Sequence, residues 1–157
     1  MDTLEIGELA RVATCDVCTT MLDLALEAAE PFENPHPLDQ GEVSALIGLA
    51  GDRQGFVAVH CTRRQAQELT ARLLGMQPDE VTDSDSILDA MGELVNMVAG
   101  NVKTEYASRG TLQISLPTVV MTPKSEIRVK ATSSAVVELD GPIGRFRVEI
   151  MLTEPSG

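Results

Sequence analysis

A repeated order of elements, in which a long helix is followed by a short β-hairpin, most strongly constrains the fold of this chain. Residues 45–51 and 135–141 have the same spacing, and each segment is followed by a glycine, a phenylalanine and an alternating strand. Each hairpin lies downstream of one long helical pattern, so we predict a duplication with halves of about 1–78 and 79–157 and extra strands in the second half. These elements predict an α+β fold, a largely antiparallel sheet with two long helices packed on one face.

Two helices are predicted in the first half. Residues 4–30 have apolar side chains at helical spacing, and the proline-rich stretch PFENPHP, which we expect to be a linker, ends the pattern. The apolar stripe comprises Leu9, Val12, Val17, Met21, Leu24 and Ala28. Thr62 and Gln65 have the spacing of a capping box, which predicts the start of a shorter helix. Gly75 ends that helix.

A second long helix is predicted over residues 86–108. The segment TDSDS supplies N-cap candidates before it, and Gly110 closes it. Its apolar face comprises Ile87, Leu88, Met91, Leu94, Val95, Val98 and Val102. The predicted strands are 43–49 and 55–61 in the first hairpin, followed after the helix by 111–116, 119–122, 126–132, 135–139 and 145–152.

The composition argues against two classes of function. Aromatic residues make up 3% of the chain and Trp is absent, so there are no platforms on which nucleic-acid bases could stack. The net charge is −12, of which residues 1–42 carry −9, whereas phosphate contacts need clustered Lys and Arg. The longest run of apolar residues and glycine, residues 45–51, is too short to span a bilayer. We therefore expect one domain, residues 1–157, that binds no nucleic acid and does not insert into a membrane.

Three cysteines raise the question of a redox or metal site. An odd number, in a chain whose first residues lack the pattern of a signal peptide, indicates reduced thiols and a cytoplasmic protein. Cys15 and Cys18 form a CxxC pair, but a zinc site would need a second pair of ligands. His60 and Cys61 are neighbours on a predicted strand, so their side chains point to opposite faces. A redox or small-molecule domain built on these four residues is the weakest interpretation, and we predict no metal site.

The second long helix has an unusual polar side. One narrow stripe at helical spacing contains Asp89, Glu93, Asn96 and Gly100, with Lys103 beside it. Asn and Gly are poor residues for a helix interior, and a helix selected for stability alone would carry Ala, Lys, Gln or Glu at both places. We interpret the stripe as a contact ridge. For Asp89 by itself we favour a structural interpretation, as the acid of a capping box that begins at Ser86.

A longer motif surrounds this ridge. Glu93 and Asn96 form an E-x-x-N pattern that continues as Met-Val-Ala-Gly-Asn, with an acid four residues earlier at Asp89 and the stretch LPTVV at residues 116–120. This motif resembles the chemotaxis phosphatase family that includes CheC and CheX, and the resemblance covers nearly the whole chain. Two-site members carry a second E-x-x-N on the first long helix. That helix has no Asn here, so the chain resembles the CheX branch, with one active ridge.

The resemblance implies a function and a partner. Members of this family remove phosphate from the aspartyl phosphate of CheY-type receiver domains. By this resemblance, Asn96 would orient the attacking water and Glu93 would pair with a receiver lysine. The other residues placed at the contact are Asp89, Gly100 and Lys103. The resemblance also implies that the chain itself needs no cofactor, because the receiver's carboxylates hold Mg²⁺, and that the chain forms a homodimer through its sheet. The alternative is a non-catalytic adaptor that docks on a receiver or on a flagellar switch protein.

Overall fold

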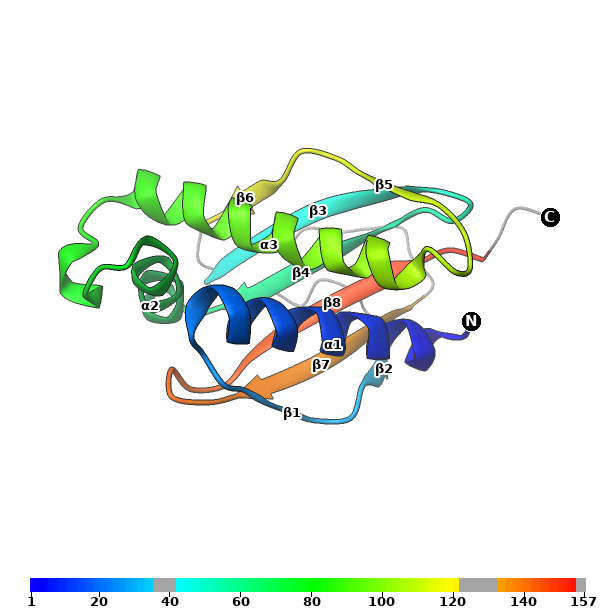
Figure 1. Ribbon diagram of the computed structural model, residues 1–157, viewed down its shortest axis with the longest axis horizontal. Helices are drawn as coiled ribbons and strands as arrows, with labels where there is room; N and C mark the ends of the chain where they lie inside the picture. The colour runs from blue at the N-terminus through cyan, green and yellow to red at the C-terminus, as the bar shows by residue number, and fades with distance from the viewer. Residues whose placement is uncertain (36–41, 122–132, 155–157) are drawn as a thin grey trace.

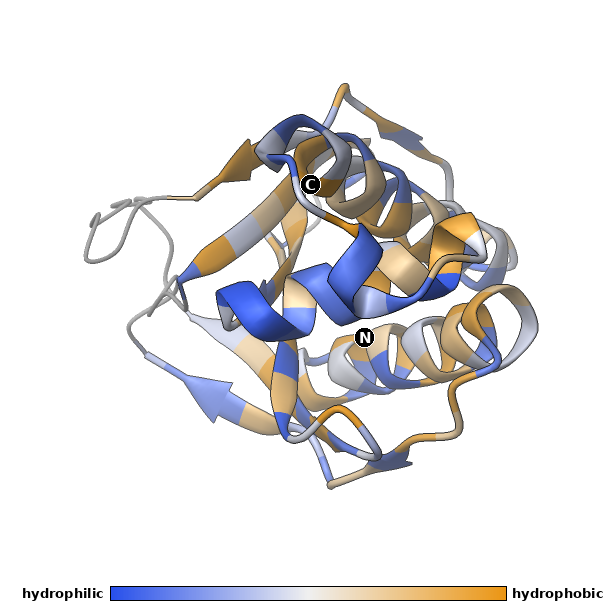
Figure 2. Cartoon of the chain, turned by 90° about the vertical axis from the view of Figure 1, so that its left-hand side faces the viewer, coloured by the Kyte–Doolittle hydropathy of each residue, from blue (hydrophilic) through white to orange (hydrophobic). Residues whose placement is uncertain are grey.

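The fold has two layers, a sheet and a layer of helices. The computed structural model describes residues 1–35, 42–121 and 133–154. The helices α1 (Thr3–Leu22) and α3 (Ser84–Tyr106) lie side by side across one face of an eight-stranded sheet (Figure 1). The shorter α2 (Arg63–Leu74) packs on α3 at one end of this layer, with the 3-10 turn η1 (Pro78–Glu80) beside it. Figure 2 shows the layers end-on. This arrangement confirms the predicted α+β class.

Two hairpins form the centre of the sheet. The first consists of β3 (Val43–Gly51) and β4 (Gly55–Cys61), and the second of β7 (Ser134–Asp140) and β8 (Phe146–Leu152). The inner strands β4 and β8 pair antiparallel with each other, so the central order is β7-β8-β4-β3. Each half of the chain therefore contributes one hairpin in the equivalent position, as the repeat predicts.

Short strands cross from each half of the chain to the other. In the first half, β1 (Glu27–Ala28) and β2 (Phe32–Asn34) pair with β7. In the second half, β5 (Leu112–Ile114) and β6 (Thr118–Val120) pair with β3. The prediction of extra strands in the second half is therefore incomplete, because the first half also carries two short strands. Each half places two short strands on the outer strand of the other half's hairpin.

The first helix is shorter than predicted. It ends at Leu22, because Asp23 adopts a left-handed conformation (φ 49°, ψ 45°) and Leu24 is buried in the core. Arg72 of α2 donates from Nη1 to the carbonyl oxygens of Leu22 (3.3 Å) and Asp23 (2.9 Å), which satisfies carbonyls left free by the helix end. The stretch predicted as a linker instead contains β2. These contacts come from α2 and β7, so the helical pattern of the sequence could not reveal them.

The repeat also extends to the helices. Gly7-Glu8-Leu9 on α1 corresponds to Gly92-Glu93-Leu94 on α3, and each glycine lies beneath a proline that precedes a short strand. A Cβ on Gly7 would lie 2.6 Å from Cβ of Pro31. A Cβ on Gly92 would lie 3.4 Å from Cγ of Pro117. Each helix thus lies close to a strand-leading segment because a glycine leaves room for the proline.

The other predicted elements agree with the structure within a few residues. The capping box of Thr62 and Gln65 and the end of α2 at Gly75 are confirmed. The second long helix starts at Ser84 rather than at Ser86. The strand predicted at 126–132 lies outside the described residues. Among the described helices, none is both long enough and apolar enough to cross a membrane.

The two paired glycines give a test of this packing. Gly7→Ala would push its methyl group into Pro31 and Ala135, and overpacking of this kind costs about 1–3 kcal/mol. Gly92→Ala meets only ordinary contact distances at Pro117, so the gain in helix propensity, about 1 kcal/mol, should be retained. We expect urea denaturation to show a lower free energy of unfolding for Gly7→Ala and an unchanged or higher one for Gly92→Ala. Equal stability of the two variants would contradict the close contact at Pro31.

Candidate active site

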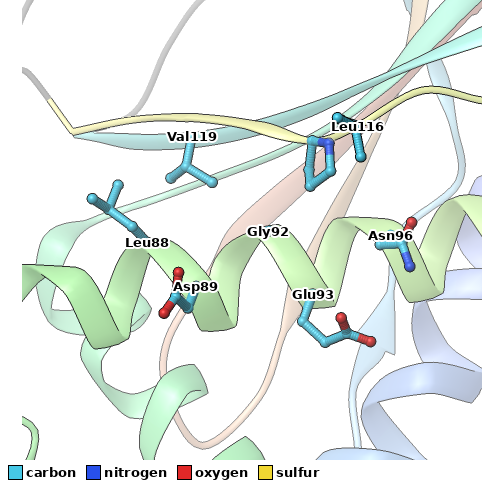
Figure 3. A pocket seen from close by; sticks show the side chains of 8 residues that line it. Leu88, Asp89, Gly92, Glu93, Asn96, Leu116 and Val119 are labelled. Atoms are coloured by element: carbon cyan, nitrogen blue, oxygen red, sulfur yellow. The ribbon is translucent and has the colours of Figure 1, made fainter.

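An open groove runs between α3 and the segment that joins β5 to β6. Its volume is about 560 Å³. Figure 3 shows the carboxylates of Asp89 and Glu93 on the outer side of α3 and the side chain of Leu116 on the facing wall. The groove is lined by Leu88, Asp89, Gly92, Glu93, Asn96, Leu116, Pro117 and Val119. The predicted ridge is therefore one wall of a concave surface.

Three polar residues of the predicted ridge lie together in this groove. Asp89 and Glu93 are exposed and Asn96 is half-buried, all on one side of α3. Within the described part of the chain, none of their side chains has a hydrogen bond or an ion pair. Two carboxylates and an amide are thus held on a rigid helix and are free to bind a partner.

The structure contradicts the capping interpretation of Asp89. The N-cap of α3 is Asp83, and Ser86 already lies within the helix, so no capping box begins there. Asp89 therefore does not stabilise the helix start through its side chain. It lies instead at one end of the groove.

Gly100 and Lys103 lie on α3 beyond the groove and do not line it. A Cβ on Gly100 would meet no atom within 4 Å, so the fold does not require glycine at this position. Lys103 is exposed. Both residues lie toward the C-terminal end of α3.

The residues of the facing wall are not among the predicted site residues. Leu116, Pro117 and Val119 belong to the LPTVV stretch, and pairing of β6 with β3 brings that stretch opposite α3. The motif was visible in the sequence, but its position depends on a long-range strand pairing. Leu88, predicted on the buried face, is half-buried and lines the groove. Gly92 also lines the groove.

The equivalent place on α1 differs in chemistry. Glu8 occupies the position of Glu93, and Arg11 occupies the position of Asn96. The guanidinium of Arg11 donates to the Glu8 carboxylate at 2.9 Å from Nε and 2.7 Å from Nη2. This hydrogen bond raises the pKa of Arg11. The acid on α1 is thus neutralised within its own helix, whereas the acid on α3 is free.

The chain is similar to known proteins in sequence and in fold. Residues 43–140 match the family described as chemotaxis phosphatase CheX. The chain belongs to the CheX family. No curated protein sequence matches it. The chemotaxis protein CheX of Desulfovibrio desulfuricans is 27% identical, with a TM-score of 0.84 over 95% of this chain and 99% of that chain.

Two other solved structures share the CheX fold at lower identity. A chain of the CheX-CheY-BeF3-Mg²⁺ complex from Borrelia burgdorferi is 23% identical, with a TM-score of 0.79 over 96% of this chain and 99% of that chain. FliY of Thermotoga maritima is 13% identical, with a TM-score of 0.64 over 93% of this chain and 86% of that chain. At these identities the likeness shows the fold alone.

The cysteines and His60 do not come together as a site. His60 bonds to Ser44 (2.8 Å) and Glu149 (3.0 Å), whereas its neighbour Cys61 is buried in the core beneath the helices. Burial raises the pKa of Cys18 and of Cys61 to about 12. In the described residues, no group of three or more His, Cys, Asp or Glu side chains is placed to hold a metal ion.

Thiol labelling tests this account of the cysteines. The thiolate is the reactive species, so at about pH 8 Cys18 and Cys61 should resist alkylation until the protein unfolds. Cys15 is only half-buried, and burial raises its pKa less, so it should be labelled first. Mass spectrometry of the labelled native protein, with Cys15→Ser as the control, measures the order. Labelling of Cys18 as fast as Cys15 would contradict it.

Proposed function

We propose that this chain accelerates hydrolysis of the aspartyl phosphate of a CheY-type receiver domain, with the chemistry on α3. The observation that carries the proposal is the pair Glu93 and Asn96, unpartnered within the described residues, on one wall of an open groove. Membership of a chemotaxis phosphatase family supports it. So does the structure of a CheX from Borrelia burgdorferi in complex with CheY, BeF3 and Mg²⁺, which shares the fold of this chain.

Asn96 would position the attacking water. Its amide can donate to a phosphoryl oxygen and accept a hydrogen bond from water, which aligns the water with the phosphorus. The water oxygen forms a bond to phosphorus while the bond from phosphorus to the aspartyl oxygen breaks. The products are the free carboxylate and inorganic phosphate, and the proton of the water leaves with phosphate or solvent. A neutral amide suits this role, because phosphoryl transfer depends chiefly on position and charge.

Glu93 would fix the docked geometry. It lies one helical turn before Asn96, and its exposed carboxylate can pair with a lysine beside the phosphorylation site of the receiver. Asp89 adds negative charge at the end of the groove, and Gly100 lets the partner approach the helix backbone. Lys103 lies at the rim of the contact. We assign Mg²⁺, which balances the charge of the phosphoryl group, to the carboxylates of the receiver.

Asn96→Ala tests the chemical step. We expect the limiting rate of dephosphorylation to fall by about 100-fold, as when one positioned hydrogen-bonding group is removed from an active site. The measurement is decay of phosphate on a CheY-type receiver charged with acetyl phosphate. Arg11→Ala, at the equivalent place on α1, is the matched control and should retain the wild-type limiting rate. Full activity of a folded Asn96→Ala variant would overturn the mechanism.

Glu93→Ala tests docking. Losing the charge pair should raise the half-saturating concentration of the phosphatase by about 10- to 100-fold, because charge-assisted hydrogen bonds contribute about 1.5–3 kcal/mol. Decay rates measured at rising phosphatase concentration separate this constant from the limiting rate. Glu8→Ala removes the corresponding acid on α1 and should change neither. If Glu93→Ala and Glu8→Ala behave alike, Glu93 has no docking role.

A non-catalytic adaptor is the second candidate. The fold shared with FliY leaves room for it, because FliY shows that the fold is not restricted to proteins named CheX. Binding of a receiver to the wild type with no acceleration of phosphate decay would establish the adaptor. The homodimer expected from the family resemblance stays a prediction, and sedimentation equilibrium tests it.

A further inference from the structure

Leu116 exposes far more apolar surface than other large hydrophobic residues of the described chain. Its exposed fraction is 89%, whereas the next, Met21, is 53% exposed. It lies on the wall of the groove opposite Asn96. A single exposed leucine is common on protein surfaces, so it is the position of Leu116 in the groove, together with Asp89 and Glu93, that points to an interaction surface.

The backbone around Leu116 is held from both sides. Before it, Ser115 accepts a hydrogen bond on Oγ from the Gly48 amide (2.8 Å) and donates its own amide to the Gly48 carbonyl (3.0 Å). The Ser115 hydroxyl also donates to the carbonyl oxygen of Leu116 (3.1 Å). After it, Pro117 has a fixed φ and restricts Leu116 to extended conformations. A side chain presented on an anchored backbone loses little entropy on binding.

The internal repeat shows that the fold does not require leucine here. Pro31 and Pro117 are equivalent, since each lies over the glycine of a Gly-Glu-Leu segment. The residue before Pro31 is Glu30, which is also exposed. The half of the chain that carries Arg11 thus has an acid at this place, and the half that carries Asn96 has an exposed leucine.

We propose that Leu116 is the apolar half of the receiver-docking surface, so that the partner contacts both walls of the groove at once. This proposal rests on the proposed function and names a second contact for the same partner. The partner must present a cationic side chain to Glu93 and an apolar side chain to Leu116. A second copy of this chain fits poorly, because symmetric docking would bring the acidic ridges of two molecules with a net charge of −12 together.

Leu116→Ser is the decisive variant. Burial of a leucine side chain on binding stabilises a complex. Loss of this contact should raise the half-saturating concentration for a phosphorylated CheY-type receiver by about tenfold and leave the limiting rate unchanged. Leu116→Met, which keeps an apolar side chain of similar volume, should restore the wild-type constant. Leu4→Ser is the matched control, since Leu4 is 49% exposed, lies on α1 and does not line the groove. Circular dichroism melts establish that all three variants fold.

The outcomes separate this inference from the proposed function. A wild-type half-saturating concentration for Leu116→Ser, with Asn96→Ala inactive, overturns the docking role of Leu116 alone. Full activity of Asn96→Ala instead contradicts the proposed function. If Leu116→Ser only abolishes self-association in sedimentation and leaves receiver docking intact, Leu116 serves a contact between copies, and the inference is wrong.

Discussion

The antiparallel pairing of β4 with β8 is the interaction on which the rest of the structure depends. It runs from Gly55 opposite Leu152 to His60 opposite Arg147 and joins the hairpins of the two halves into one sheet. Gly55 is required at its start, because a side chain there would collide with the Met151 carbonyl. One continuous sheet gives both long helices a face to cover. It also lets β6 of the second half pair with β3 of the first, which builds the wall of the groove opposite α3.

Helix α3 can carry residues that weaken a helix because its other face is buried. Met91, Val95, Val98 and Val102 are fully buried against the sheet and the neighbouring helices. Tertiary packing of an apolar face supplies most of the stability of a helix in a folded protein. The loss in helix propensity at Asn96 and Gly100 is small by comparison. The same burial fixes the helix in place, so the polar side chains of the groove have defined positions.

The two halves share a backbone arrangement but differ in the side-chain interactions of the glutamate it carries. Both have a Gly-Glu-Leu segment beneath a proline. On α1 the glutamate is tied to Arg11, and on α3 Glu93 has no partner within the described residues. An exposed pair three residues apart on a helix contributes only about 0.2–0.5 kcal/mol. The difference therefore has little effect on folding and a large effect on which groups a partner can reach.

The sequence by itself determined the class of the fold and the ridge. Helical spacing identified both long helices, and the stripe of Asp89, Glu93 and Asn96 followed from the angle between successive helical residues. Only the tertiary structure decided what faces that stripe, because Leu116 reaches it through the pairing of β6 with a strand far away in the chain. The end of α1 was also decided by tertiary contacts, since Arg72 of another helix binds its last carbonyls. The spacing of apolar and polar residues along the sequence indicates which residues share a face of one helix or strand. Contacts between distant elements depend instead on the folded topology.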